Sequence, residues 1–229
     1  MNPLIRAAVL IAVLFTAGAA LTPAGPQAEE SGMSLPEPEL DGEVSLEAAL
    51  AARRSVRSFV DATMSLETLS QLCWAGQGVS DQQRGFRTAP SAGALYPLEL
   101  YVAAGNVGGI DAGIYRYLPE PHELKRELDG DLREELAGAA LGQRWIAEAP
   151  VVFVVVGVPE RLERRYGPRA ERYTILEAGH VGQNIALQAV TRDLGTTMVG
   201  AFVDDEVARI LDLKSGHQPL YVIPAGEPR

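Results

Sequence analysis

The sequence predicts a mixed fold of the α+β or α/β class, and three observations support this. Segments with helical periodicity, such as residues 170–195, alternate with extended segments such as residues 98–104. The run PVVFVVVGV at 150–158 is apolar almost throughout, which is typical of a strand buried on both faces. Apolar side chains make up 47% of the 229 residues, enough for a sizeable core. The predicted strands are too few, and the helices too many, for a β-sandwich.

The first 28 residues are typical of a secretory signal peptide. One arginine precedes an unbroken apolar run, and Ala17-Gly18-Ala19 offers a small-residue cleavage site. The run is short for a membrane-spanning helix, so an uncleaved N-terminal anchor that tethers the chain to a membrane is the second interpretation. A third is that translation starts at Met33 and the protein is cytoplasmic. The first interpretation predicts an exported or periplasmic protein.

Residues 29–43 are rich in proline and acidic side chains and predict a linker, so that order begins near Ser45. The folded domain is then expected over residues 44–229. Ser45 and Ser65 each precede apolar residues at helical spacing, which predicts capped helices over 45–55 and 65–76. The single cysteine, Cys73, lies in the apolar stripe of the second helix and is expected to be buried.

Beyond these helices the pattern predicts strands and helices in turn. Strands are expected at 98–104, 113–119, 150–158 and 218–226, and helices at 130–149, 170–195 and 204–213. The helix at 170–195 carries small residues, including Gly179 and Gly182, which would let another backbone or a flat ligand approach closely. On that helix His180 is expected to be buried and hydrogen-bonded, with Glu177 one turn earlier on the same face.

Charge and motif content exclude several classes of function. With 30 acidic against 20 basic side chains, the net charge of −10 argues against nucleic-acid binding. The sequence contains no phosphate-binding P-loop, no dinucleotide-binding glycine fingerprint and no common motif for a catalytic serine or zinc site. A single cysteine excludes an intrachain disulfide, and the three histidines are not spaced as metal ligands, so no metal site is expected.

A basic cluster near the end of the first predicted helix has two interpretations. Arg53 and Arg57 would converge on one helical face, with Ser55 between them. Such side chains can complement the negative end of the helix. They can equally bind a phosphate ester, which prefers forked guanidinium donors and short hydroxyl donors.

Two further stretches favour contact between backbone and a planar ligand. In APSAGALYPLELYV (89–102), Gly93 and its alanine neighbours leave the main chain accessible, and Gly200 does the same in GTTMVGAF (195–202). Each stretch taken alone is also compatible with a tight loop or a packing glycine. Together with the basic cluster, they indicate a flavin mononucleotide more than a sugar phosphate.

The order of these motifs resembles that of a known family. RRSVRSF, RTAPSAGALYPLELYV, GIYRY, RYTILEAGHVGQNIALQA, GAFVDD and PLYVIPAG resemble the FMN-dependent nitroreductase superfamily over residues 35–228. The likeness is greatest to the branch of SagB-type, or thiazole/oxazole-oxidase-like, dehydrogenases. The resemblance implies an α+β fold with a central, mainly antiparallel sheet wrapped by helices. It also implies an obligate homodimer with FMN at its interface.

The resemblance assigns cofactor-binding roles to three segments. The phosphate ligands would be Arg53, Arg54 and Ser55, and Arg57 would reach the N1/O2 edge of the flavin. The loop Pro90, Ser91, Ala92, with Gly93 beside it, would cross onto the ring of the other subunit. The backbone of Met198, Val199 and Gly200 would face the dimethylbenzene and N5 side of the ring. Relatives often carry a basic residue after the last glycine, whereas Glu227 follows Gly226 here, so Arg229 is the available substitute.

Arg172 and Tyr173 resemble the Lys/Arg-Tyr pair that serves as the acid–base group in azoline oxidases of this branch. Those oxidases carry lysine before the tyrosine, and arginine is a poor proton shuttle at neutral pH. The resemblance implies hydride transfer from a reduced donor, NAD(P)H, through flavin N5 to an electron-poor small molecule, or dehydrogenation of a substrate. The alternative is an exported, dimeric flavin-binding or scaffold protein without turnover.

Overall fold

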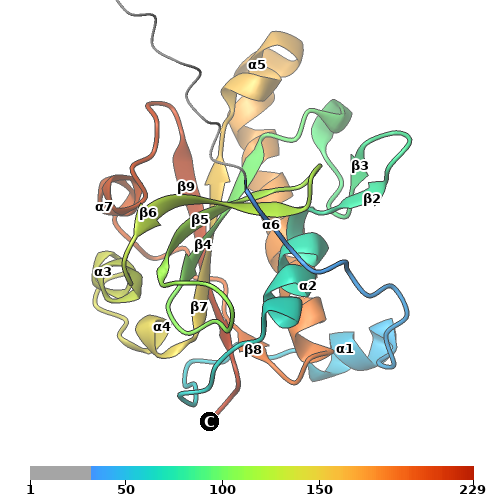
Figure 1. Cartoon of the computed structure of the whole chain (residues 1–229). Helices are drawn as coiled ribbons and strands as arrows, with labels where there is room; N and C mark the ends of the chain where they lie inside the picture. Colours follow the sequence, from blue (N-terminus) through green and yellow to red (C-terminus); the bar gives the residue numbers. More distant parts are fainter. Residues whose placement is uncertain (1–31) are drawn as a thin grey trace, which may run out of the picture. The chain divides into compact units, whose positions relative to one another are not determined.

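Strand β7 (Val151–Gly157) is a fully buried inner strand of the computed structural model, which describes residues 32–229 (Figure 1). Its neighbours in a seven-stranded sheet are β4 (Leu98–Ala104) and β9 (Gln218–Gly226). Beyond β4 lie β5 (Gly113–Leu118), β6 (Glu123–Asp129) and β1 (Met33–Ser34), and beyond β9 lies β8 (Gly195–Thr196). Every neighbouring pair is antiparallel, which confirms the predicted α+β class.

Two apolar cores form on opposite sides of β7. Val151, Phe153 and Val155 belong to a core with helices α2 (Leu66–Gln77) and α6 (Ala170–Val190). The alternate residues Val152, Val154 and Val156 belong to a second core with α3 (Arg133–Ala139), α4 (Trp145–Glu148) and α7 (Asp204–Ile210). Every β7 side chain is buried, as the unbroken apolar run predicts.

Serine caps begin the first two helices, as predicted. Ser45 Oγ accepts a hydrogen bond from Ala48 N at the start of α1 (Leu46–Ala52), and Ser65 Oγ accepts one from Thr68 N, both at 3.1 Å. These bonds satisfy amides that the first helical turn leaves without partners. Cys73 is buried in α2, which confirms its expected place.

Several predicted boundaries are wrong. Helix α1 ends at Ala52, so residues 53–57 are not helical. The helix expected over 130–149 is two short helices, separated by Leu141 and Gly142 with φ of 59° and 73°. Left-handed backbone of this kind ends a helix. Strand β6 was not predicted, because its sequence ELKRELD is mostly charged.

The chain becomes ordered before Ser45, contrary to the prediction. Met33 and Ser34 pair with Leu124 and Glu123 of β6, and Leu35 is buried. The side chains of Ser70 and His122 lie 2.5 Å and 2.9 Å from the Pro36 carbonyl and hold the segment there. The predicted signal segment 1–28 lies outside the described residues. No helix within residues 32–229 is long and apolar enough to cross a lipid bilayer.

The buried position of β7 predicts a large loss of stability on truncation of its aromatic side chain. Phe153 is completely buried, so Phe153→Ala should lower the free energy of unfolding by about 3–5 kcal/mol. Phe86→Ala is the matched control, because Phe86 is 44% exposed on the hairpin of β2 (Val79–Asp81) and β3 (Phe86–Arg87). Urea denaturation measures both, and equal losses in the two variants would contradict this packing.

Candidate functional site

The basic segment 53–57 lies against the segment that begins at β8. Val56 N donates to Thr196 O at 3.0 Å, and Thr197 Oγ1 donates to Val56 O at 2.6 Å. Gly195 permits this approach, because a Cβ at that position would overlap the Val56 side chain. The pairing with Thr196 holds the backbone around Ser55 in an extended conformation, where a helix was predicted. It also brings two of the three predicted cofactor segments together.

The four side chains of the basic cluster have different environments. Arg54 Nη1 donates to the carbonyls of Ala51 and Arg53 at 2.8 Å and 2.7 Å, so this guanidinium complements the end of its own helix. The Arg57 guanidinium lies 5.9 Å from the centre of the Trp145 ring. Arg53 and Ser55 make no side-chain hydrogen bond or ion pair within residues 32–229. These two side chains are therefore available for an anion.

The segment Met198–Gly200 is fixed by the last strand of the sheet. Val199 is buried, and its N–H and C=O both bond Val222 at 2.9 Å. Its amide is thus engaged and cannot donate to a ligand at the same time. Met198 packs against Gly182 of α6. A Cβ added to Gly182 would lie only 3.1 Å from Met198 Cγ. Gly200 is exposed, and within the described chain neither its amide nor that of Met198 has a hydrogen-bond partner, so these two amides remain as donors.

The predicted loop 90–93 is the first part of a longer loop, residues 90–96, with an unusual backbone conformation. It leads into the short 3₁₀ helix η1 (Ala92–Ala94), and Ser91 Oγ accepts a hydrogen bond from Tyr96 N at 2.9 Å. Gly93, Ala94 and Tyr96 have φ of 62°, 54° and 47°. Left-handed backbone costs energy for residues other than glycine, and such strain is concentrated at functional sites.

Helix α5 (Glu160–Tyr166) supports this loop and connects it to the predicted catalytic pair. A Cβ at Gly93 would lie 2.6 Å from Arg165 Nη1 and 2.8 Å from the Tyr166 hydroxyl. The Tyr166 ring meets the Tyr173 ring edge to face, with 5.1 Å between their centres. Arg172 is exposed beside Tyr173. The structure therefore groups Arg172 and Tyr173 with the loop.

Glu177 is a buried acid that the sequence analysis did not assign to the site. It is 2% exposed on α6, and neither carboxylate oxygen has a hydrogen-bond partner of normal geometry among residues 32–229. Burial raises the pKa of Glu177 to about 7, although the nearby Ser91 hydroxyl and Ala92 amide pull it down. His180 is exposed, so the prediction of a buried histidine is wrong. The sequence did contain one indication that Glu177 is buried: it is an acidic residue beside small residues on a helix that was predicted to pack closely.

The predicted residues form two groups along α6. Arg53 and Ser55 lie with Thr196, just beyond the helix end at Val190, whereas the 90–93 loop lies near Glu177 in the first half of the helix. Val190 follows Glu177 by thirteen positions along the helix, or about 20 Å at 1.5 Å per helical residue. Figure 1 shows α5 and α1 beside opposite ends of α6. The members of each group come together within one chain, but the two groups lie apart from each other.

Comparisons with known proteins agree on one family. The model of the nitroreductase family matches residues 50–227. A protein of Methanocaldococcus jannaschii that bears the name nitroreductase is 45% identical over 194 residues, which are 85% of this chain and 96% of that protein. A crystal structure from Ralstonia eutropha JMP134, also described as a nitroreductase, has a TM-score of 0.78 at 29% identity. The superposition covers 89% of this chain and 92% of the other.

A more distant structure shares the fold alone. The NADPH:FMN oxidoreductase of Vibrio harveyi, in complex with NAD⁺, has a TM-score of 0.58 at 18% identity. The match covers 80% of this chain and 68% of that one.

The buried Glu177 predicts a dependence of stability on pH. Its pKa is raised from 4.5 to about 7 in the folded chain, so its contribution is fully present below pH 4.5 and is lost as pH rises to about 7. Relative to Glu177→Gln, the wild-type free energy of unfolding should fall by about 3 kcal/mol across this window, at about 1.4 kcal/mol per pKa unit. Urea denaturation at several pH values measures the difference.

The control for this prediction is Glu171→Gln on the same helix, because the exposed Glu171 carboxyl stays in water in both states. A difference between wild type and Glu177→Gln that stays level from pH 4.5 to 7 would show that the carboxyl is not buried as described.

Proposed function

The chain belongs to the nitroreductase family, and from this premise we propose that it is a flavin-dependent oxidoreductase that binds FMN. One observation carries the proposal. Among residues 32–229 the side chains of Arg53 and Ser55 have no partner, and they lie on the segment that pairs with Thr196. The exposed Gly200 follows Thr196 four residues later. An anion-binding pair and an open backbone amide thus belong to one connected unit. The likeness in fold to an NADPH:FMN oxidoreductase supports the same conclusion.

The residues present fit a flavin mononucleotide. The Arg53 guanidinium and the Ser55 hydroxyl are the donors that a phosphate monoester prefers. The Gly200 amide suits an acceptor on a flat ring. When bound, FMN would supply the hydride chemistry, so the protein itself needs to bind, orient and exchange protons. The absence of a nucleophile motif from the sequence agrees with this division of roles.

A second copy of the chain would complete the site. The 90–93 loop is apart from Arg53 in one chain, so it would act on a flavin held by its partner, as in a homodimer. The exposed side chains of Ile175 and Leu176 on α6 offer apolar surface for such an association. We further propose that NAD(P)H is the reductant, that an electron-poor small molecule is the acceptor, and that the protein belongs to the SagB-type branch.

Tyr173 would hold a proton at its phenol oxygen in this scheme. It lies beside the 90–93 loop through its contact with Tyr166, and the cationic Arg172 precedes it. The guanidinium of Arg172 would act as a fixed charge instead of a proton donor.

Purification of the full chain tests the proposed function. We expect a yellow dimer with a flavin absorption spectrum that bleaches when NADH or NADPH is added without oxygen. Addition of nitroaromatic, quinone or enone acceptors should restore the colour. A protein that takes up no FMN would contradict the proposal, and a yellow protein without turnover would support the flavin-binding alternative.

The phosphate role of Arg53 predicts weaker FMN binding in Arg53→Ala. Loss of a charge-assisted hydrogen bond costs about 1.5–3 kcal/mol, which corresponds to a roughly 10- to 100-fold rise in Kd. Fluorescence titration of FMN into the flavin-free protein measures Kd. Arg84→Ala is the control, because Arg84 is exposed in the turn between β2 and β3. Equal Kd values for both variants would assign the phosphate to other residues.

The proton role of Tyr173 predicts that Tyr173→Phe lowers kcat by about 100-fold or more, as expected for the loss of an acid–base group. The Kd for FMN should stay unchanged, because the ring and its contact with Tyr166 are kept. Steady-state kinetics with a fixed acceptor measures kcat. An unchanged kcat would exclude Tyr173 as the proton donor in the rate-limiting step.

A further inference from the structure

The buried carboxylate of Glu177 faces two loop donors that have no acceptor of their own. Ser91 Oγ accepts a hydrogen bond from Tyr96 N, so the hydroxyl proton remains available for a further acceptor. The Ala92 amide donates to no backbone carbonyl among residues 32–229. Both donors lie near the carboxylate and lower its pKa, yet neither makes a hydrogen bond of normal geometry with it. Two acceptors and two donors are thus close together and unpaired within the described chain.

The burial of Glu177 makes these donors matter. The residue is 2% exposed, and a buried ionised carboxylate is unfavourable unless hydrogen-bond donors surround it. An ionised carboxylate accepts at both oxygens, and its hydrogen bonds are about twice as strong as those of a neutral group. A protonated carboxyl uses one oxygen to carry its proton and attracts the donors less. The attraction between Glu177 and the loop therefore depends on the charge of the carboxyl.

Arg87 is the charged side chain that acts on Glu177 from a neighbouring strand, and its positive charge lowers the pKa of the carboxyl. Its guanidinium is held elsewhere, because it donates to Gln77 Oε1 at 3.0 Å and to Glu120 Oε1 at 2.8 Å. Burial outweighs its attraction and raises the pKa of Glu177 to about 7. The carboxyl is therefore neutral below about pH 7 and ionised above it.

Other titratable side chains border this junction. On α6, Tyr173 and His180 lie about one turn from Glu177, and His180 is exposed, so water screens its charge. From α5, Arg165 and Tyr166 face the loop at Gly93. None of these side chains is a carboxylic acid. Glu177 is the member of this set that gains a negative charge as pH rises through 7.

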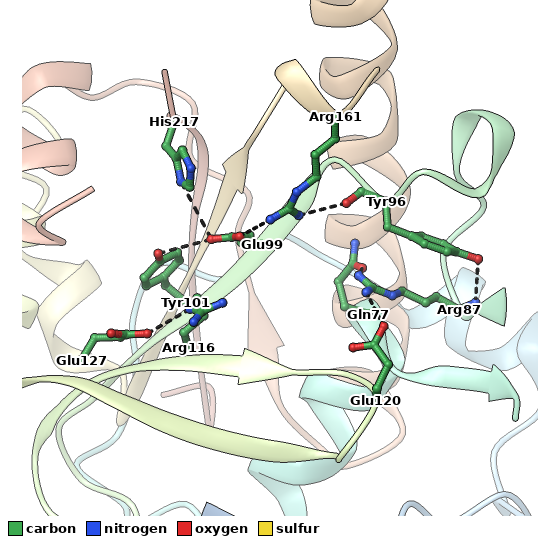
Figure 2. A network of polar contacts seen from close by, with 10 residues as sticks. All are labelled: Gln77, Arg87, Tyr96, Glu99, Tyr101, Arg116, Glu120, Glu127, Arg161 and His217. Atoms are coloured by element: carbon green, nitrogen blue, oxygen red, sulfur yellow. Dashed lines mark hydrogen bonds and ion pairs between the residues drawn. The ribbon is translucent and has the colours of Figure 1, made fainter. Parts of the chain in front are cut away.

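The far end of the loop is held by contacts that do not depend on a carboxyl proton. Figure 2 shows Tyr96 joined to Arg161 through its carbonyl, at 3.1 Å, and to the Arg87 amide through its hydroxyl, at 3.3 Å. The Arg87 guanidinium also lies 4.4 Å from the centre of the Tyr96 ring. A strained loop keeps its conformation only where its surroundings hold it. The hold near Glu177 is thus the part that responds to pH.

We propose that Glu177 is a positioning residue for the 90–96 loop: its ionised carboxylate accepts hydrogen bonds from the Ser91 hydroxyl and the Ala92 amide and keeps the loop in its strained conformation. Protonation of the carboxyl weakens this hold. The consequence for turnover rests on the proposed function, in which the loop acts on the flavin of a partner subunit. The hold on the loop itself requires no flavin.

NMR spectra of the flavin-free full chain, recorded from about pH 5.5 to about pH 8.5, test the hold on the loop. We expect the ¹³C signal of the Glu177 carboxyl to titrate with a midpoint of about 7. The Ala92 amide proton should move downfield with the same midpoint, because its hydrogen bond strengthens. The Ala92 signal should stay level in Glu177→Gln. Glu135→Gln, the same change at an exposed residue of α3, should keep the wild-type titration.

The wild-type spectra alone can overturn the proposal, whether or not a variant folds. It fails if the Ala92 signal does not follow the Glu177 carboxyl in the wild-type protein. It also fails if the Ala92 signal titrates equally in Glu177→Gln, because another group would then cause the shift.

Steady-state kinetics with a fixed acceptor tests the consequence for turnover. Misplacement of a catalytic element by about 1 Å can lower a rate by about 100-fold. The ratio of kcat in wild type to kcat in Glu177→Gln should therefore rise by about tenfold or more between about pH 5.5 and about pH 8.5. Glu135→Gln should keep the wild-type profile. A constant ratio in an active, yellow protein would overturn the positioning role in turnover.

The two measurements separate this inference from the proposed function. A protein that takes up no FMN would contradict the proposed function. If its Ala92 signal still followed the Glu177 carboxyl, the hold on the loop would stand.

Discussion

The burial of β7 on both faces is the constraint on which the rest of the structure depends. Its side chains alternate between two cores, so helices must cover both faces of the sheet. Its neighbours then position the candidate site. Strand β9 carries Val222, which pairs with Val199 and so holds the Met198–Gly200 segment. Strand β4 begins directly after the strained loop. Because β4 pairs with β7, it holds the end of that loop in place. The most apolar part of the chain thus determines where the polar site lies.

Helix α6 connects the two groups of residues that make up the candidate site. Small residues on its inner face let it pack closely on the sheet, and Gly182 makes room for Met198. One half of the helix supports the strained loop and buries Glu177, while the segment that follows its last turn pairs with the basic cluster. A single rigid helix therefore fixes the separation between the two groups. That separation is the physical reason for invoking a second copy of the chain.

Sequence patterns predicted the elements that are governed by local chemistry. The run at 150–158 and the serine caps at Ser45 and Ser65 follow from burial and from unpaired amides, and both were predicted correctly. Strand β6 escaped prediction because its extended state comes from pairing with β5 and not from its own charged residues. The basic cluster was expected to be helical, but pairing of Ser55 with Thr196 competes with the helix. The contact between Gln77 and Arg87 depends on packing between α2 and β3, which no local pattern reports.

The two edge strands of the sheet, β1 and β8, are each only two residues long. Short edge strands limit the ways in which a second chain could pair with the sheet. Beyond its short pairing with β1, strand β6 carries the charged residues Lys125, Arg126 and Asp129. Charged side chains on a short, partly covered edge disfavour the docking of a foreign strand. Growth of a continuous intermolecular sheet, the route to fibrils, is therefore disfavoured at this margin.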